Sequence, residues 1–341
     1  MTDRTGAIRA FIDSTDWAGA ATAPLAGDAS NRRYLRLTHP VSGKSAVLMD
    51  APPERGEDVR PFIHIAEYLT GTGLSAPHIL ARDTQAGFLL LEDLGDDLFA
   101  SVIPDRPELE NRLYSTATDL LVTLHDHDAP DGLDGYSPAL MADLAALAFD
   151  WYLPATGNAD PAARKRFLTA MLNALSHHAD TADVLIQRDY HAQNLLWLPD
   201  RTGVARVGLL DFQDAMLGHR AYDLVSLLQD ARRDVPPAIE DAMIRHYIAE
   251  THADPETFRT AYAVLGAQRN LRILGVFARL CLRDGKAHYV DLIPRVWNHL
   301  MRDLEHPALT DVAQIVQNTL PSPAPSTLQK VKDQCAITPV R

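Results

Sequence analysis

Three polar residues in the second half of the chain have the types and spacing that phosphoryl transfer requires. Asp189 and Asn194 stand five residues apart, and Asp211 follows seventeen residues later at the end of an apolar run. The reaction needs a carboxylate that orients the attacking hydroxyl and accepts its proton, and oxygen ligands for Mg²⁺ bound to the phosphates of ATP. Asp189 fits the first role, and Asn194 and Asp211 fit the second.

The segments that must position these residues change in character along the chain. Strand patterns are expected at 33–38, 45–49, 79–82 and 87–91, with a helical pattern at 56–70. Helical spacing then dominates, at 108–125, 138–152, 161–177, 221–231, 237–251, 255–282 and 290–304. Short β-like pieces interrupt it at 184–187, 195–198 and 204–210. The pattern predicts a small β-rich lobe, a larger helical lobe and a cleft between them.

Composition narrows the class of protein. The chain has 341 residues and a formal net charge of −13, which disfavours nucleic acid and anionic membranes as partners. Its two cysteines, Cys281 and Cys335, cannot form a disulfide framework and suit a reducing compartment. We see no signal peptide and no apolar run of membrane-spanning length. A soluble, cytoplasmic protein is expected.

The segment 187–194 resembles the catalytic loop H-x-D-x-H-x-x-N of the aminoglycoside phosphotransferase superfamily, whose members are small-molecule kinases. Asp189, His191 and Asn194 match this motif, and Gln187 stands in the place of its first histidine. The resemblance covers about residues 20–305. It implies ATP and Mg²⁺ as cofactors and an α+β, bilobal, protein-kinase-like fold.

This fold implies an organisation in three parts. Residues 1–94 are expected to form the N-lobe, a nucleotide-binding sheet with one helix. Residues 95–310 are expected to form the helical C-lobe, which carries the catalytic loop and the substrate site. Residues 311–341 contain a proline-rich stretch and are expected to be a peripheral tail.

Two further segments, 211–215 and 222–228, are similar to one branch of the superfamily, the anomeric N-acetylmuramate/N-acetylglucosamine kinases of bacterial cell-wall recycling. The resemblance implies phosphorylation of the anomeric hydroxyl of an amino sugar. The product would be a sugar α-1-phosphate, which a uridylyltransferase would use next.

The resemblance also implies supporting roles for other positions. The turn 27–31, with Ser30, would face the phosphates, and the backbone of Glu92 and Leu94 would hydrogen-bond adenine. Asp223 would brace the catalytic loop, with structural support from Arg188 and His191.

One position departs from the kinase pattern. Met49 stands where a third-strand lysine normally contacts the α- and β-phosphates. The phosphates still need a cation in a cleft of low dielectric constant. We expect Arg33 to supply it, in preference to the alternative that Arg33 is a surface residue.

An arginine stripe could govern substrate choice. At about 100° per residue, Arg272, Arg279 and Arg283 lie within about 80° of Arg269 on one helix face. A solvated face and a substrate role are equally open. N-acetylmuramate carries a lactyl carboxylate, which arginine binds well. Under the second reading, Arg269 or Arg272 recognises that carboxylate.

Two alternatives remain open at this stage. An aminoglycoside or other small-alcohol phosphotransferase could have the same fold, and acidic residues would then gather at its substrate end. A non-catalytic nucleotide-binding module is the alternative from another class, motivated by Met49 and Gln187.

Overall fold

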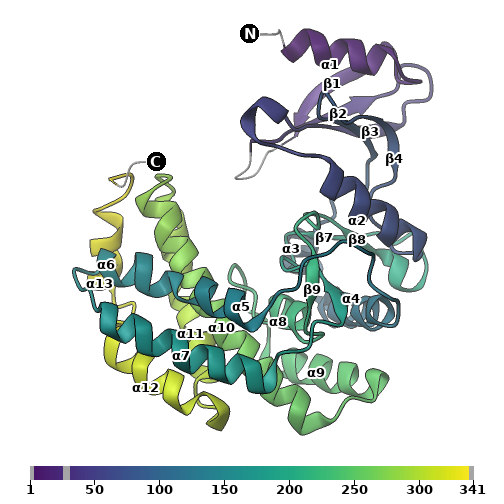
Figure 1. Ribbon diagram of the computed structural model, residues 1–341. Coiled ribbons are helices and arrows are strands. Elements are labelled where there is room, and N and C mark those ends of the chain that lie inside the picture. Colours follow the sequence, from purple (N-terminus) through teal and green to yellow (C-terminus); the bar gives the residue numbers. More distant parts are fainter. Residues whose placement is uncertain (1–3, 26–30, 338–341) are drawn as a thin grey trace. The chain divides into compact units, whose positions relative to one another are not determined.

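The computed structural model describes residues 4–25 and 31–337 and divides the chain into two compact units (Figure 1). Unit 1 comprises Met1–Leu120 and Ala192–Ala215, and unit 2 comprises Leu121–His191 and Met216–Arg341. This division differs from the expected boundary at residue 94, since unit 1 also contains residues 95–120 and the hairpin that follows the catalytic loop. We describe each unit by itself.

A five-stranded antiparallel sheet forms the centre of unit 1. Its strands follow the order β1-β2-β3-β5-β4. Their bounds are β1 Ala21–Leu25, β2 Arg33–Thr38, β3 Ser45–Asp50, β4 Ile79–Asp83 and β5 Phe88–Glu92. The four strands expected from the sequence are present. The sequence does not predict β1, because this edge strand contains Pro24 and shows no apolar alternation.

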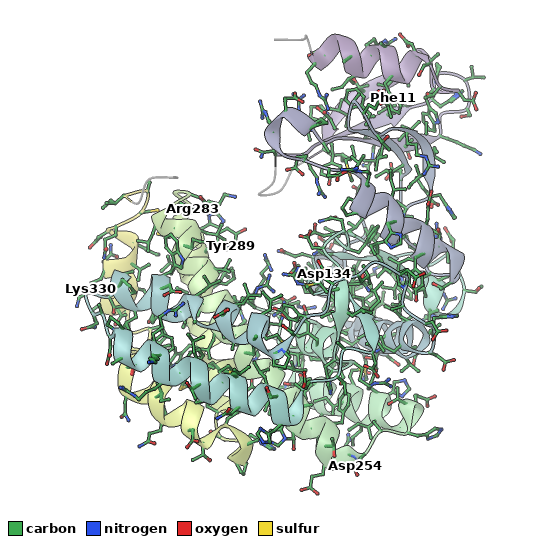
Figure 2. The ribbon with its side chains drawn as sticks, in the orientation of Figure 1. Phe11, Asp134, Asp254, Arg283, Tyr289 and Lys330 are labelled. Carbon is green, nitrogen blue, oxygen red and sulfur yellow. The ribbon has the colours of Figure 1, made fainter. Side chains whose placement is uncertain are left out.

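Two helices flank the sheet, where the sequence predicts one. Helix α1 (Arg4–Asp13) packs on one face, where its Ile8 and Ile12 join a buried apolar cluster. Figure 2 labels Phe11 on this helix, and its ring stacks on Phe88 of β5 at 5.4 Å. Helix α2 (Arg60–Gly71) is the predicted one, and its Phe62 packs on Phe212.

The remainder of unit 1 contains the hairpin β7 (Leu195–Trp197) and β8 (Val207–Leu209), with α3 (Phe99–Asp105) and most of α4 (Glu110–His125). Gly208 allows close packing in this hairpin. A Cβ atom there would lie 3.0 Å from Leu196 and 3.2 Å from Leu94. The hairpin therefore lies against the segment that follows β5.

Unit 2 is mainly helical and is built around α10 (Pro255–Leu282), which has buried residues along its length. It contacts α5 (Pro138–Ala145), α7 (Pro161–His178), α8 (Tyr222–Leu228), α9 (Pro237–Thr251) and α11 (Ile293–Asp303). A two-stranded ladder joins β6 (Val184–Ile186) to β9 (Met216–Gly218). The predicted bounds of α9 and α10 are reproduced because both helices begin with proline and α10 has an Asp254 cap.

Two parts of unit 2 differ from expectation. The predicted helix 138–152 is interrupted, since α5 ends at Ala145 and a π-helical turn at Ala148–Tyr152 leads into α6 (Leu153–Ala155). At this break the backbone of Leu147 approaches Gly275 of α10 so closely that a Cβ atom would lie 2.3 Å from it.

The expected peripheral tail is folded onto unit 2. Helix α12 (Thr310–Thr319) packs on α7, and α13 (Pro325–Lys332) contacts α10. Val316 and Val331, one from each helix, are fully buried. Across residues 4–25 and 31–337, no helix combines the length and the apolar character needed to cross a membrane.

Candidate active site

Asp223 holds the backbone of the predicted catalytic loop in unit 2. Its carboxylate is fully buried in the first turn of α8 and accepts hydrogen bonds from the backbone N–H groups of Gln187 (2.6 Å) and Arg188 (2.8 Å). Arg188 adopts a left-handed conformation with φ of 70° immediately before Asp189. Because the contact is made to the main chain, it does not require the histidine that Gln187 replaces.

The charges around Asp189 favour its ionised form. Burial pushes the pKa of this carboxyl upward, but nearby positive charges, those of Arg272, Arg269 and Arg188 among them, outweigh burial and hold the pKa below its usual value. Asp189 is therefore a carboxylate at neutral pH. This is the protonation state that a residue needs to orient a hydroxyl and accept its proton.

Arg269 and Arg272 share one face of α10 but make different contacts. Arg269 is buried, and its Nη2 donates to Ser226 Oγ at 2.7 Å, while Ser226 Oγ donates to the carbonyl of Arg188 at 3.2 Å. Arg272 is partly exposed and lies beside Tyr222, with Nη1 at 3.4 Å from its hydroxyl. Arg269 thus supports the loop from within, whereas Arg272 lies nearer to solvent.

The other two arginines of the predicted stripe, Arg279 and Arg283, have different surroundings. Arg283, labelled in Figure 2 at the end of α10, pairs with its neighbour Asp284 at 2.7 Å. Desolvation, followed by the charge of Arg283, lowers the pKa of Arg279. Of the four arginines, Arg272 and Arg269 are the two among the main causes that lower the pKa of Asp189.

Sequence reasoning missed two partners of the loop. Arg232 places Nη1 3.2 Å from His191 Nε2, and burial lowers the pKa of His191 to about 4, so that its neutral ring accepts this hydrogen bond. The guanidinium of Arg188 lies 5.3 Å from the ring of Tyr136. The charged residues within 230–233 directly follow an apolar helix, and this position could have marked Arg232 as a candidate. Nothing local marks Tyr136.

Unit 1 brings Asn194 and Asp211 together. Asn194 Nδ2 lies 3.5 Å from Asp211 Oδ2, and the carbonyl of Asn194 accepts the N–H of Leu210 at 3.0 Å. Asp211 has a left-handed φ of 58°, and Gln213 donates to its Oδ1 at 2.8 Å. An amide and a carboxylate side by side offer the hard oxygen donors that Mg²⁺ prefers, leaving further positions for phosphates and water. These residues fit the metal.

In the predicted hinge, the backbone N–H groups of Glu92 and Leu94 differ in their hydrogen bonding. The N–H of Glu92 donates to the carbonyl of His78 at 2.8 Å, and its carboxylate pairs with Arg201 at 2.6 Å. Among the described residues, none accepts a hydrogen bond from the N–H of Leu94. Arg36 fixes the loop that follows through ion pairs with Asp93 and Asp96.

The structure does not bring Arg33 to the position expected for a phosphate-binding cation. Its Nε donates to Asp50 at 3.0 Å, and Arg4 of α1 donates to the other oxygen of this carboxylate at 2.8 Å. Arg33 and Asp50 are paired in register, on the face of the sheet that α1 covers. Side chains alternate along a strand, so Met49 lies on the opposite face. Ser30 and most of the turn 27–31 lie outside the described residues.

Arg32 lies on the side of the sheet that Arg33 does not reach. It pairs with Glu57 at 2.8 Å and hydrogen-bonds the hydroxyl of Tyr34. Burial raises the pKa of Tyr34, Arg32 opposes this rise, and the charge of Asp211 adds to it. Tyr34 thus responds to the charges of both Arg32 and the predicted metal ligand Asp211.

An antiparallel sheet, a braced loop that carries an ionised aspartate, and an adjacent asparagine and aspartate are features expected of a kinase-like phosphotransferase. The chain belongs to the family described as "Phosphotransferase enzyme family", whose model matches residues 21–260. The predictions of a phosphotransferase, and of the α+β fold of the aminoglycoside phosphotransferases, are confirmed.

Particular relatives make the comparison finer. An N-acetylmuramate/N-acetylglucosamine kinase of Caulobacter vibrioides is 40% identical, covering 91% of this chain and 95% of its own. A protein of the same name from Pseudomonas aeruginosa is 34% identical, covering 86% and 87%. The GDP complex of a wild-type aminoglycoside 2'-phosphotransferase is similar in structure, with a TM-score of 0.58, 13% identity, and coverage of 89% and 98%. The predicted resemblance is confirmed.

Proposed function

We propose that the protein is an ATP-dependent kinase that phosphorylates the anomeric hydroxyl of N-acetylmuramate, N-acetylglucosamine or both. The main support for this proposal is the environment of Asp189. Neighbouring arginines keep its carboxylate ionised, and Asp223 holds the backbone of the loop that carries it. The substrate is inferred from the relatives of this name, which align over nearly the whole chain.

Each residue of the site has a distinct role in this proposal. Asp189 orients the C1 hydroxyl and accepts its proton. Asn194 and Asp211 would hold Mg²⁺, which, when bound, neutralises charge on the phosphates. The N–H of Leu94 would donate to adenine.

The arginines beside Asp189 favour a neutral or anionic substrate. Arg272, Arg269 and Arg188 all contribute positive charge at this carboxyl. A polycationic aminoglycoside would meet repulsion there, because like charges near a substrate site disfavour binding. The geometry thus supports an amino sugar over the aminoglycoside alternative.

Arg272 is the better candidate for recognising the lactyl carboxylate of N-acetylmuramate, because Arg269 is buried and bonded to Ser226. Arg272→Met should lower kcat/KM for N-acetylmuramate at least tenfold more than for N-acetylglucosamine, which corresponds to a difference in free energy of about 1.4 kcal/mol.

Arg272→Met should also raise the pKa of Asp189, since a neighbouring cation is removed. The acid limb of the pH–rate profile should therefore shift to higher pH. Steady-state kinetics with both sugars across pH measure both effects.

Arg283→Met is the matched control, since Arg283 lies on the same helix and pairs with Asp284. It should leave the ratio of the two sugars and the pH profile unchanged. An equal loss with both sugars in Arg272→Met would refute carboxylate recognition, and an unmoved acid limb would refute its effect on Asp189.

Arg32 is our candidate for the cation that replaces the lysine missing at Met49. Arg32→Ala should lower kcat/KM for ATP. The corresponding loss of transition-state stabilisation should be about 2–4 kcal/mol, as expected for the loss of a preorganised charge donor. Arg33→Ala is the control, because Arg33 faces α1 and Asp50 keeps Arg4 as a partner. Measuring kcat/KM for ATP in both variants decides between the two arginines. A decrease confined to Arg33→Ala would show that Arg33 is the phosphate-binding cation, as expected from the sequence.

A screen for ADP release tests the proposed function. Purified protein with ATP and Mg²⁺ should release ADP with N-acetylmuramate or N-acetylglucosamine and not with kanamycin, choline or homoserine. Turnover with kanamycin alone would overturn the proposal. No turnover with any acceptor, but saturable ATP binding, would favour the non-catalytic nucleotide-binding module.

We place the reaction in the cytoplasm, where ATP is available. A sugar 1-phosphate is the substrate class of a uridylyltransferase, which would form a nucleotide sugar from it. This enzyme is the proposed next step and needs no direct contact with the chain.

A further inference from the structure

The chain has two cysteines, and the fold brings them together although 54 positions separate them in sequence. Cys281 lies in the last turn of α10, and Cys335 follows α13. The thiol of Cys335 donates to the carbonyl of Cys281 at 3.2 Å, and the thiol of Cys281 donates to the carbonyl of Val331 in α13 at 3.7 Å. Both cysteines therefore lie where the C-terminal segment docks on the end of α10.

Several contacts other than the sulfur atoms hold this segment in place. Val331 of α13 is fully buried, and Lys332 pairs with Asp291 at 2.6 Å. Gln334 donates to the carbonyl of Ala155 at 2.7 Å. Figure 2 labels Lys330 on this helix, within the same unit as Arg283 at the end of α10. The packing of α13 on unit 2 therefore holds Cys335 near Cys281.

The backbone beside Cys335 fixes the approach of the two residues. Ala336 donates its N–H to the carbonyl of Cys281 at 3.0 Å and adopts a left-handed φ of 61°. A non-glycine residue takes this conformation at a cost, which the surrounding contacts must offset. A disulfide joins residues whose backbones lie close together. Hydrogen bonds from Ala336 and from the Cys335 thiol to the carbonyl of Cys281 hold the two backbones next to each other.

We propose that Cys281 and Cys335 form a reversible intramolecular disulfide that fastens the C-terminal segment to the end of α10. With hydrogen peroxide as oxidant, the two thiols lose two electrons and two protons, one S–S bond forms, and the O–O bond of the peroxide breaks to give two molecules of water. Disulfides in reducing compartments are usually transient and respond to oxidants. The proposal is independent of the substrate of the enzyme.

The two sulfur atoms differ in how they would take part. Cys335 is partly exposed, so that peroxide can reach it and form a sulfenic acid. Cys281 is buried, and burial raises the pKa of its thiol to about 12. Its sulfur would then attack the sulfenic sulfur, and the displaced hydroxide takes up the proton of Cys281. Because the two residues lie beside each other in the folded chain, their proximity compensates for the low thiolate concentration that this pKa implies.

Thiol counting on the full-length protein tests the proposal. The protein is treated with a small excess of hydrogen peroxide, alkylated under denaturing conditions and weighed by intact mass spectrometry. We expect the reduced protein to carry two alkyl groups and the oxidised monomer to carry none and to be lighter by two hydrogens. Dithiothreitol should restore both alkylation sites, and a tryptic digest should yield a peptide pair joined through Cys281 and Cys335.

Two variants make the test decisive. Cys335→Ser removes the more exposed thiol without opening the core, and Cys281→Ala serves as a second variant. Oxidation should raise the Tm of the wild type and leave that of Cys335→Ser unchanged, since a cross-link restricts the unfolded chain. Two alkylated thiols after oxidation, sulfinic acid at Cys335, or a disulfide-linked dimer as the main product would each overturn the proposal.

Discussion

Replacing Asp189 with asparagine is expected to lower kcat about 10²–10⁴-fold, which is the rate enhancement that a positioned general base contributes. Asparagine has nearly the same shape but cannot accept the proton of the sugar hydroxyl. Asp223 bonds the backbone of Gln187 and Arg188, so the loop should keep its conformation. Binding of ATP with Mg²⁺ should remain within a few-fold of wild type. Single-turnover kinetics and nucleotide titration separate the two quantities.

Asp180→Asn is the matched control for this variant. Asp180 is exposed and precedes β6, nine positions before the proposed base. It should retain wild-type kcat and pH dependence. Turnover of Asp189→Asn within a few-fold of wild type would remove Asp189 from the mechanism, whatever the substrate.

The second large effect is expected at Asp211. Asp211→Asn should reduce kcat by at least about 10²-fold, because a charged oxygen ligand of the proposed Mg²⁺ site is lost. Asparagine tolerates the left-handed backbone found at φ of 58°, whereas alanine would add strain. The substitution therefore tests the charge and not the fold. Unlike Asp189→Asn, this variant should weaken nucleotide binding in the presence of Mg²⁺.

The Mg²⁺ dependence of nucleotide affinity is the appropriate measurement. Wild-type protein should bind ATP more tightly with Mg²⁺ than without it, and Asp211→Asn should lose most of this difference. Asp200→Asn, an exposed residue of the same unit, should behave as wild type. If Asp211→Asn keeps both turnover and the Mg²⁺ effect, another group holds the metal.

The sequence was most informative where periodicity and end signals agree. Strand β2 and helices α9 and α10 have the predicted bounds. Helix α1 was missed because only Ile8 and Ile12 of its ten residues are buried, which leaves a weak apolar pattern. The break after α5 was also invisible, because it accompanies a close approach between Leu147 and Gly275 from distant parts of the chain.

Side-chain direction limited the prediction of the site. In β2, polar and apolar residues occur on both faces, so the sequence could not indicate that Arg33 faces α1 and pairs with Asp50. In α10, Arg269 and Arg272 are about 60° apart on a helical projection. One is nevertheless buried against Ser226 while the other is partly exposed, because α10 is enclosed by other helices over much of its length.

The residues around Asp189 show which contacts of the predicted site local sequence can indicate and which it cannot. The five-residue interval between Asp189 and Asn194 lies within one continuous loop and its hairpin, which local sequence specifies. Arg232 and Tyr136 reach the same loop from other segments, through contacts that depend on the tertiary fold. Their roles could be assigned only once the packing was known.

The central claim is that phosphate is transferred to the anomeric oxygen, and the reducing end of the sugar tests this most directly. Purified protein, ATP, Mg²⁺ and N-acetylmuramate or N-acetylglucosamine are incubated while ADP and reducing ends are measured in parallel, and ³¹P NMR locates the phosphate. We predict one reducing end lost for each ADP formed, and coupling of the phosphorus to the anomeric proton. ADP formed with the reducing end retained, and phosphorus coupled to another position of the sugar, would contradict the account.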